Sequence, residues 1–154
     1  MRRTSLLVIA VTLHNIPEGM AVGLTFALAA QQNGGPEAYA AAIALAIGMG
    51  IQNFPEGAAI SLPLMQEGMS RNKAFALGAL SGLAEPVFGI LTVFIASSIA
   101  PYMPWLLSAA AGSMMYVVVE ELIPEANLGD HSNAGTLGVM GGFLIMMILD
   151  VALG

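Results

Sequence analysis

Residues 5–30 read SLLVIAVTLHNIPEGMAVGLTFALAA, an apolar stretch that contains the polar hexapeptide HNIPEG at residues 14–19. A second apolar stretch, residues 38–65, contains a near-copy, QNFPEG, at residues 52–57. Because about 20 apolar residues suffice to cross a bilayer, each stretch predicts a transmembrane helix. Each hexapeptide then places a carboxylate, an amide and a proline inside the hydrocarbon layer, where an ionisable side chain needs a partner. The repeated pattern predicts a polar site within a helical membrane protein.

The composition of the whole chain favours a membrane protein. The chain has 154 residues, of which 57% are hydrophobic and 9% are charged, whereas soluble domains have about 25% charged residues. There is no cysteine, which excludes disulfides and thiolate metal ligands. Ten acidic residues outnumber four basic ones and give a net charge of -6, so nucleic acid is not an expected partner.

Five apolar stretches predict five transmembrane helices in a single transmembrane domain, residues 1–154. Turn-forming residues separate them, and the predicted ranges are 5–30, 38–65, 73–98, 102–124 and 135–153. No stretch alternates as a strand would, so the expected fold class is all-α, a polytopic transmembrane helix bundle. Glycines spaced four residues apart predict close helix packing; these pairs are Gly19 and Gly23, Gly78 and Gly82, and Gly138 and Gly142.

The basic residues predict the orientation of the bundle. Arg2 and Arg3 precede the first helix, and Arg71 and Lys73 lie between the second and the third. These positions are on the same side of an alternating bundle, and loops rich in Lys and Arg stay in the cytoplasm. We therefore expect a cytoplasmic N-terminus and, after five crossings, a C-terminus outside.

Helix periodicity gathers the polar side chains of each hexapeptide on one face. His14 and Glu18 lie one turn apart, and Asn15 lies on the other side of Glu18. The second hexapeptide repeats this arrangement with Gln52, Asn53 and Glu56. If the two helices are antiparallel and face each other, they could hold two adjacent cations, bridged by Glu18 and Glu56.

A third carboxylate, Glu85, precedes Pro86 near the centre of the third predicted helix. Pro17 and Pro55 lack the backbone N–H, so we expect each to kink its helix and to free a carbonyl oxygen. Three unpaired carboxylates at this depth would cost about 8–10 kcal/mol, which a divalent cation offsets; neutral, hydrogen-bonded glutamic acids at ordinary kinks are the alternative. Imidazole with carboxylates and amides suits zinc, iron, manganese or cadmium better than Cu(I).

The two Asn-x-Pro-Glu-Gly motifs resemble those of the ZIP (Zrt/Irt-like) family of divalent metal transporters, most closely its bacterial GufA-like branch. Glu85-Pro86 and the segment EELIPE at residues 120–125 support the resemblance. The ZIP fold has eight transmembrane helices, and the five predicted here resemble the last five. The resemblance implies an integral protein of the bacterial inner membrane.

The resemblance also implies a binuclear metal centre in the transport path. One site would comprise His14, Glu18, Gln52 and Glu56. The other would comprise Asn15, Glu18, Asn53, Glu56 and Glu85. Glu120 and Glu121 would correspond to an acidic pair near the cytoplasmic exit. Many zinc-selective relatives have histidine where this chain has Gln52, so strict zinc selectivity is not implied.

The expected function is transport of divalent metal cations into the cytoplasm, with Zn²⁺ first and iron, manganese or cadmium as further substrates. The alternative is a non-transporting metal-binding fragment that needs the missing helices from another chain. The metal ion and the lipid bilayer are the expected partners, with a homodimer or association with the missing N-terminal helices as the assembly. An intramembrane metalloprotease needs His-Glu-x-x-His, which the chain lacks, so we do not expect an enzyme.

Overall fold

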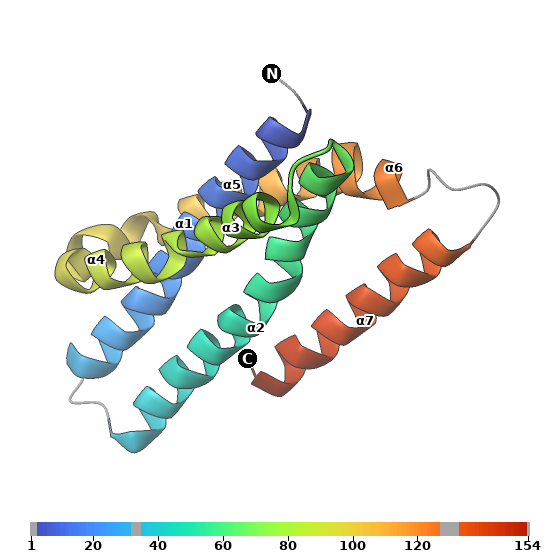
Figure 1. The fold of residues 1–154 in the computed structure, drawn as a ribbon. Helices are drawn as coiled ribbons and strands as arrows, with labels where there is room; N and C mark the ends of the chain where they lie inside the picture. Colours follow the sequence, from blue (N-terminus) through green and yellow to red (C-terminus); the bar gives the residue numbers. More distant parts are fainter. Residues whose placement is uncertain (1–2, 32–34, 127–132, 154) are drawn as a thin grey trace.

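A computed structural model describes residues 3–31, 35–126 and 133–153 of the chain, and within these ranges every regular element is helical. Helix α1 (Arg3–Gln31) and helix α2 (Pro36–Gln66) lie side by side and run in opposite directions (Figure 1). Two shorter helices follow, α3 (Arg71–Gly82) and α4 (Ala84–Ile99). Both hexapeptides therefore lie in the middle of long helices.

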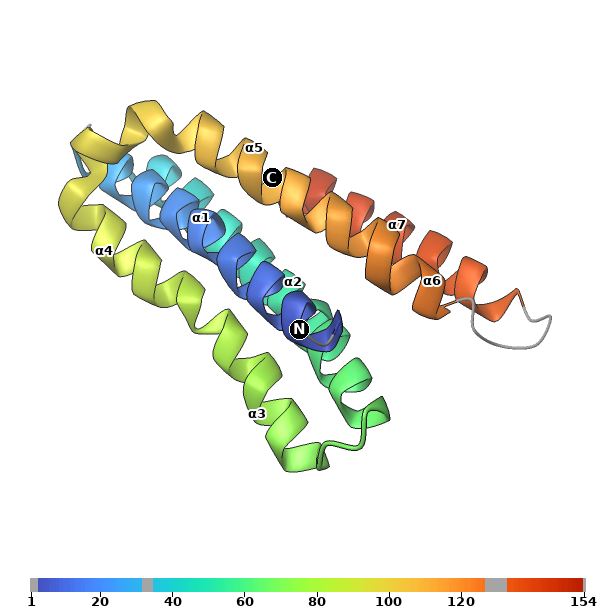
Figure 2. The same ribbon diagram turned by 90° about the horizontal axis from the view of Figure 1, so that it is seen from above.

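The second half of the chain begins with a reversal. A 3-10 turn, η1 (Ala100–Tyr102), leads into α5 (Met103–Val117), and α4 and α5 run in opposite directions (Figure 2). The chain continues through a π-helical turn, η2 (Val118–Leu122), and the short helix α6 (Ile123–Ala126). The last helix is α7 (Ala134–Leu153).

The helices confirm the predicted all-α polytopic bundle. In the described part of the chain, three helical stretches are long and apolar enough to cross a membrane, namely 5–31, 36–66 and 71–120. The third stretch includes the reversal at η1, so it traverses the bundle twice (Figure 2). A further apolar helical stretch covers residues 134–148.

The predicted helix 73–98 lies within one apolar helical stretch, residues 71–120, and contains a one-residue turn. It is divided at Leu83 into α3 and α4, and Ile95 has a non-helical backbone (φ -119, ψ 16). Pro86 cannot donate to the carbonyl of Gly82, so one helical hydrogen bond is missing at this turn. By contrast, α1 and α2 stay helical across Pro17 and Pro55. Helix α2 also continues across Pro63, so each internal proline removes one backbone hydrogen bond without ending its helix.

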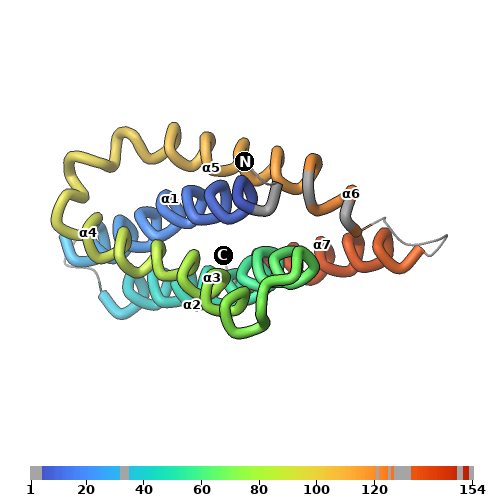
Figure 3. The backbone as a smooth tube through the Cα atoms, turned by 45° about the horizontal axis from the view of Figure 1, so that its top comes forward, coloured from blue at the N-terminus to red at the C-terminus, as the bar shows by residue number. Residues whose placement is uncertain are grey.

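Helix α1 is the centre of the bundle. It contacts α2, α3, α4 and α5, most extensively α4. In Figure 3, α5 and α6 lie on one side of α1, whereas α2 and α3 lie on its other side. Near its N-terminal end, Leu7 and Val11 pack in a buried apolar cluster with Ile60 of α2 and Val117 of α5. The polar residues of the first hexapeptide are therefore surrounded by other helices.

Two glycines bring α1 and α4 into backbone contact. A methyl group added at Gly19 would overlap the backbone of Glu85, and one added at Gly23 would overlap that of Gly89. This confirms the close packing predicted for the first glycine pair. The pair on α7 differs, because added methyl groups at Gly138 and Gly142 would meet nothing within 4 Å.

Candidate metal centre

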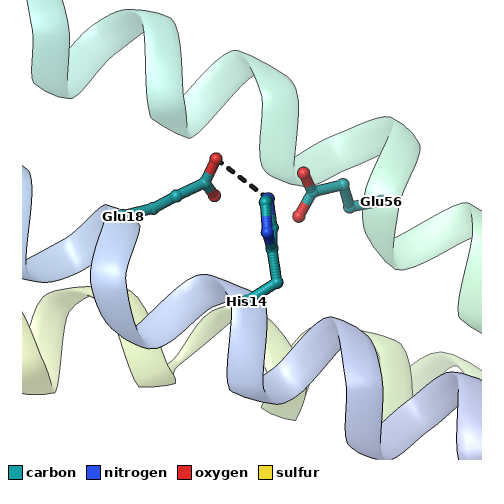
Figure 4. A group of neighbouring side chains, drawn as sticks. All are labelled: His14, Glu18 and Glu56. Atoms are coloured by element: carbon teal, nitrogen blue, oxygen red, sulfur yellow. Dashed lines mark ion pairs between the residues drawn. The ribbon is translucent and has the colours of Figure 1, made fainter. Parts of the chain in front are cut away.

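Side chains of α1 and α2 converge between the two helices. His14 and Glu18 of α1 and Glu56 of α2 point toward one another (Figure 4). One ligand atom from each lies within 4.8 Å of the others, and His14 Nε2 is 3.1 Å from Glu18 Oε1. Among the described residues this is the only such group of three or more His, Cys, Asp or Glu side chains. The two hexapeptides thus face each other as expected.

Gln52 links the two carboxylates. Its Nε2 donates hydrogen bonds to Glu18 Oε1 at 3.1 Å and to Glu56 Oε1 at 2.9 Å. A glutamine amide has donors on its nitrogen and acceptors on its oxygen. Rotated by half a turn, the same amide would therefore present its oxygen to a cation that the carboxylates hold.

Three buried oxygens around this group have no hydrogen-bond partner. They are Asn15 Oδ1, Glu18 Oε2 and Glu56 Oε2. Buried side-chain oxygens nearly always have a partner, because an unpaired one costs about 1–3 kcal/mol. All three belong to predicted ligands, and carboxylate and amide oxygens with an imidazole form a suitable donor set for zinc or a similar divalent ion. The residues present therefore fit a divalent cation.

The second predicted site is less compact than the first. Asn53 donates from Nδ2 to the carbonyl of Met49 in its own helix at 3.2 Å. Glu85 is buried and its backbone lies against Gly19, but it does not belong to the three-residue group of His14, Glu18 and Glu56. Asn53 and Glu85 instead line a largely apolar pocket of about 410 Å³ between α1, α2 and α4.

Two backbone carbonyls contact the predicted ligands of α1, and neither was predicted from the sequence. Ala110 of α5 lies with its carbonyl oxygen 3.0 Å from His14 Nδ1. Ser81, in the last turn of α3, accepts a hydrogen bond from Asn15 Nδ2 at 3.2 Å. Such partners orient ligands and raise metal affinity. No side chain marks them in the sequence, because every residue carries a carbonyl.

The predicted exit pair lies in the π-helical turn η2. Glu120 is exposed there, and Glu121 follows it, although the Glu121 side chain is outside the described part of the structure. Single π-helical turns inside α-helices occur frequently at functional sites. The turn was not predicted from the sequence, since one extra residue in a turn leaves no clear periodic signal.

The fold and the site together define a class of protein, a polytopic helical membrane protein with a cluster of imidazole, carboxylate and amide side chains between two of its helices. Residues 1–150 match the sequence model described as ZIP Zinc transporter. The chain belongs to this family, as its two motifs predicted.

Named relatives support the assignment to the family. The chain is 45% identical over 153 residues to zinc transporter ZIP11 of Homo sapiens, and the aligned region covers 99% of this chain and 44% of that protein. It is 40% identical over 152 residues to zinc transporter GufA of Myxococcus xanthus, and the aligned region covers 97% of this chain and 56% of GufA. For zinc transporter ZIPB of Bordetella bronchiseptica, the identity is 39% over 154 residues, with 100% and 47% covered. The chain thus spans about half the length of these relatives.

Proposed function

We propose that this protein moves divalent metal cations across a membrane, with Zn²⁺ as the first substrate, through the polar site between α1 and α2. The observation that carries the proposal is the set of buried, unpartnered oxygens beside His14. A bound cation would supply the positive charge that compensates these buried oxygens. The relatives are named zinc transporters, which favours transport over the protease considered from the sequence.

In this proposal the site residues form two adjacent sets of ligands for a cation that has lost its water molecules. In the first site, His14 Nε2, Glu18 and Glu56 are the ligands, with the Gln52 oxygen as a fourth. Asn15, Asn53 and Glu85 complete an adjacent second site with the same two bridging carboxylates. Two neighbouring sites of this kind let an ion pass from one to the other without losing all its ligands at once.

We further propose that the N-terminus of the chain faces the cytoplasm of a bacterial cell and that the cation moves inward. The start of α1 and the turn between α2 and α3 lie at the same end of the bundle (Figure 1). The basic residues of both segments then face the cytoplasm. Glu120 and Glu121 would receive the ion on that side, because an acidic mouth attracts cations.

The site is proposed to work within a larger assembly, a homodimer or a bundle completed by the helices that precede these five in the ZIP fold. The pocket beside Asn53 and Glu85 supports this. Its apolar wall lies next to buried ligands that a membrane transporter must shield from lipid.

Zinc uptake into proteoliposomes tests the proposal. The chain is reconstituted with a zinc-sensitive dye inside the vesicles, beside a Glu18→Ala, Glu56→Ala double variant. We expect uptake by the wild-type chain and none by the double variant. Glu37→Ala is the matched control, because Glu37 is an exposed carboxylate in the first turn of α2. Zinc binding without uptake by the wild-type chain would instead support a metal-binding protein that does not transport by itself.

A further inference from the structure

The link between α5 and His14 carries an inference beyond the ligand set. The carbonyl oxygen of Ala110 lies 3.0 Å from His14 Nδ1, in a buried contact between residues 96 positions apart. A carbonyl oxygen only accepts hydrogen bonds, so Nδ1 must carry the proton. The other ring nitrogen, Nε2, faces Glu18 at 3.1 Å. The contact with α5 therefore keeps a proton on Nδ1, and Nε2, which donates to the Glu18 carboxylate here, is the nitrogen that can bind a cation once it gives up its proton.

The position of this carbonyl is set by the packing of α5 on α1. Ala110 is buried, and Val117, seven residues further along α5, packs against Leu7 and Val11 of α1. The small Ala110 side chain lets the two helices approach closely at the level of His14. The carbonyl also accepts a hydrogen bond from Ser113 Oγ at 2.7 Å, so polar hydrogens converge on it from both helices.

The neighbouring ligand, Asn15, is held by a different helix. Its Nδ2 donates to the carbonyl of Ser81 in α3, not to α5. Two ligands adjacent in sequence are thus oriented by two helices on different sides of α1. A displacement of α5 relative to α1 would disturb His14 and leave the hydrogen bond of Asn15 in place.

We propose that α5, through the Ala110 carbonyl, positions His14 with Nε2 toward the metal and so sets the affinity of the first site. Ala110 is thus a positioning residue and not a ligand. The proposal rests on the proposed binding of a divalent cation between α1 and α2. It adds that this affinity depends on a helix that supplies no ligand to the site.

The protonation of the two ring nitrogens of His14 tests the geometry directly. The chain has two histidines, and a His131→Gln variant leaves His14 as the sole signal in a protein labelled with ¹⁵N-histidine. In detergent micelles we expect a protonated Nδ1 both without metal and with Zn²⁺, and a zinc-dependent shift at Nε2. An unprotonated Nδ1 in either state would overturn the proposal. This measurement reports on α5 even if the protein proves not to transport.

A double-mutant cycle tests the effect on affinity. Ala110→Leu forces α5 away from α1, whereas Ala109→Leu adds the same bulk at an exposed position of α5. We expect Ala110→Leu to weaken Zn²⁺ binding about 10- to 100-fold in calorimetric titrations, and Ala109→Leu to leave it unchanged. In a His14→Ala background, Ala110→Leu should have no further effect.

The outcomes separate this proposal from the proposed function. An equal loss of zinc binding on Ala110→Leu with and without His14 would show a general packing effect and overturn the role of Ala110. If the wild-type chain binds no Zn²⁺ at all, the proposed function fails. The nitrogen protonation still decides the positioning of His14 in that case, and also if Ala110→Leu does not fold.

Discussion

The hexapeptide of α1 lies at the centre of the bundle, whereas its near-copy in α2 lies at an open face. Asn15 and Glu18 are 0% and 8% exposed, while their counterparts Asn53 and Glu56 are half-buried. The contrast is large at the third position of the hexapeptides, where Phe54 is 83% exposed and Ile16 is half-buried. The same local sequence thus has two surroundings: the α1 copy is enclosed by other helices, and the α2 copy places Gln52 and Glu56 against it from one side.

Removal of either carboxylate should give the largest loss of zinc affinity, and the loss should be similar for the two hexapeptides. We expect Glu18→Ala and Glu56→Ala each to lower zinc affinity about 100-fold or more, or about 2.8 kcal/mol, because both carboxylates belong to the three-residue group. Calorimetric titration with Zn²⁺ measures this, with Glu37→Ala as control. A wild-type affinity in either site variant would break the assignment.

The glycines that end the two hexapeptides should respond unequally to the same substitution. A methyl group at Gly19 would overlap the Glu85 backbone, whereas at Gly57 it would be 3.5 Å from the Gly78 carbonyl oxygen, an ordinary contact. We expect Gly19→Ala to destabilise the protein by about 1–3 kcal/mol and Gly57→Ala to be close to neutral. Unfolding in detergent measures both. Equal destabilisation would contradict the central position of α1.

A histidine at position 52 would make the first positions of the two hexapeptides identical. Imidazole is a stronger ligand for zinc than a glutamine amide, and Gln52 already lies between the two carboxylates. We expect Gln52→His to raise zinc affinity about tenfold, which is about 1.4 kcal/mol, and to raise selectivity for Zn²⁺ over Mn²⁺. Competition titrations with the two metals measure this, with His14→Gln as the converse variant. Weaker zinc binding by Gln52→His would place the residue outside the ligand set.

The smallest effect is expected at the exposed apolar position of the second hexapeptide. Phe54 is largely exposed, so Phe54→Ala should change the free energy of unfolding by less than about 0.5 kcal/mol. Ile16, at the matching position of α1, is half-buried, so Ile16→Ala should cost more. Thermal unfolding of the two variants compares them. A large loss on Phe54→Ala would show that another segment covers this face in the assembled protein.

Much of this arrangement was predictable because it depends on long-range regularities of the sequence. Apolar length predicted helices, and one-turn spacing predicted that His14 and Glu18 share a face. The repeat of the hexapeptide predicted that Glu56 would face them, and the two motifs predicted the ZIP family. These features are properties of side chains at fixed helical intervals, which the sequence displays directly.

The remaining features arise from contacts that no side-chain pattern encodes. The break at Leu83 and the continuity of α1 at Pro17 both involve prolines, and only the packing around each decides whether the helix continues. The carbonyls of Ala110 and Ser81 are backbone atoms, so their role depends on where α5 and α3 pack. The unequal burial of Asn15 and Asn53 likewise follows from the central place of α1, which the near-identical motifs could not show.

X-ray absorption at the zinc edge tests the central claim most directly, that a divalent cation binds between α1 and α2 with His14 as a ligand. For the zinc-loaded His131→Gln chain, we predict one imidazole and otherwise oxygen ligands at about 2.0–2.2 Å, with the imidazole signal lost in an added His14→Ala substitution. A spectrum without imidazole, or one that His14→Ala leaves unchanged, would contradict the account.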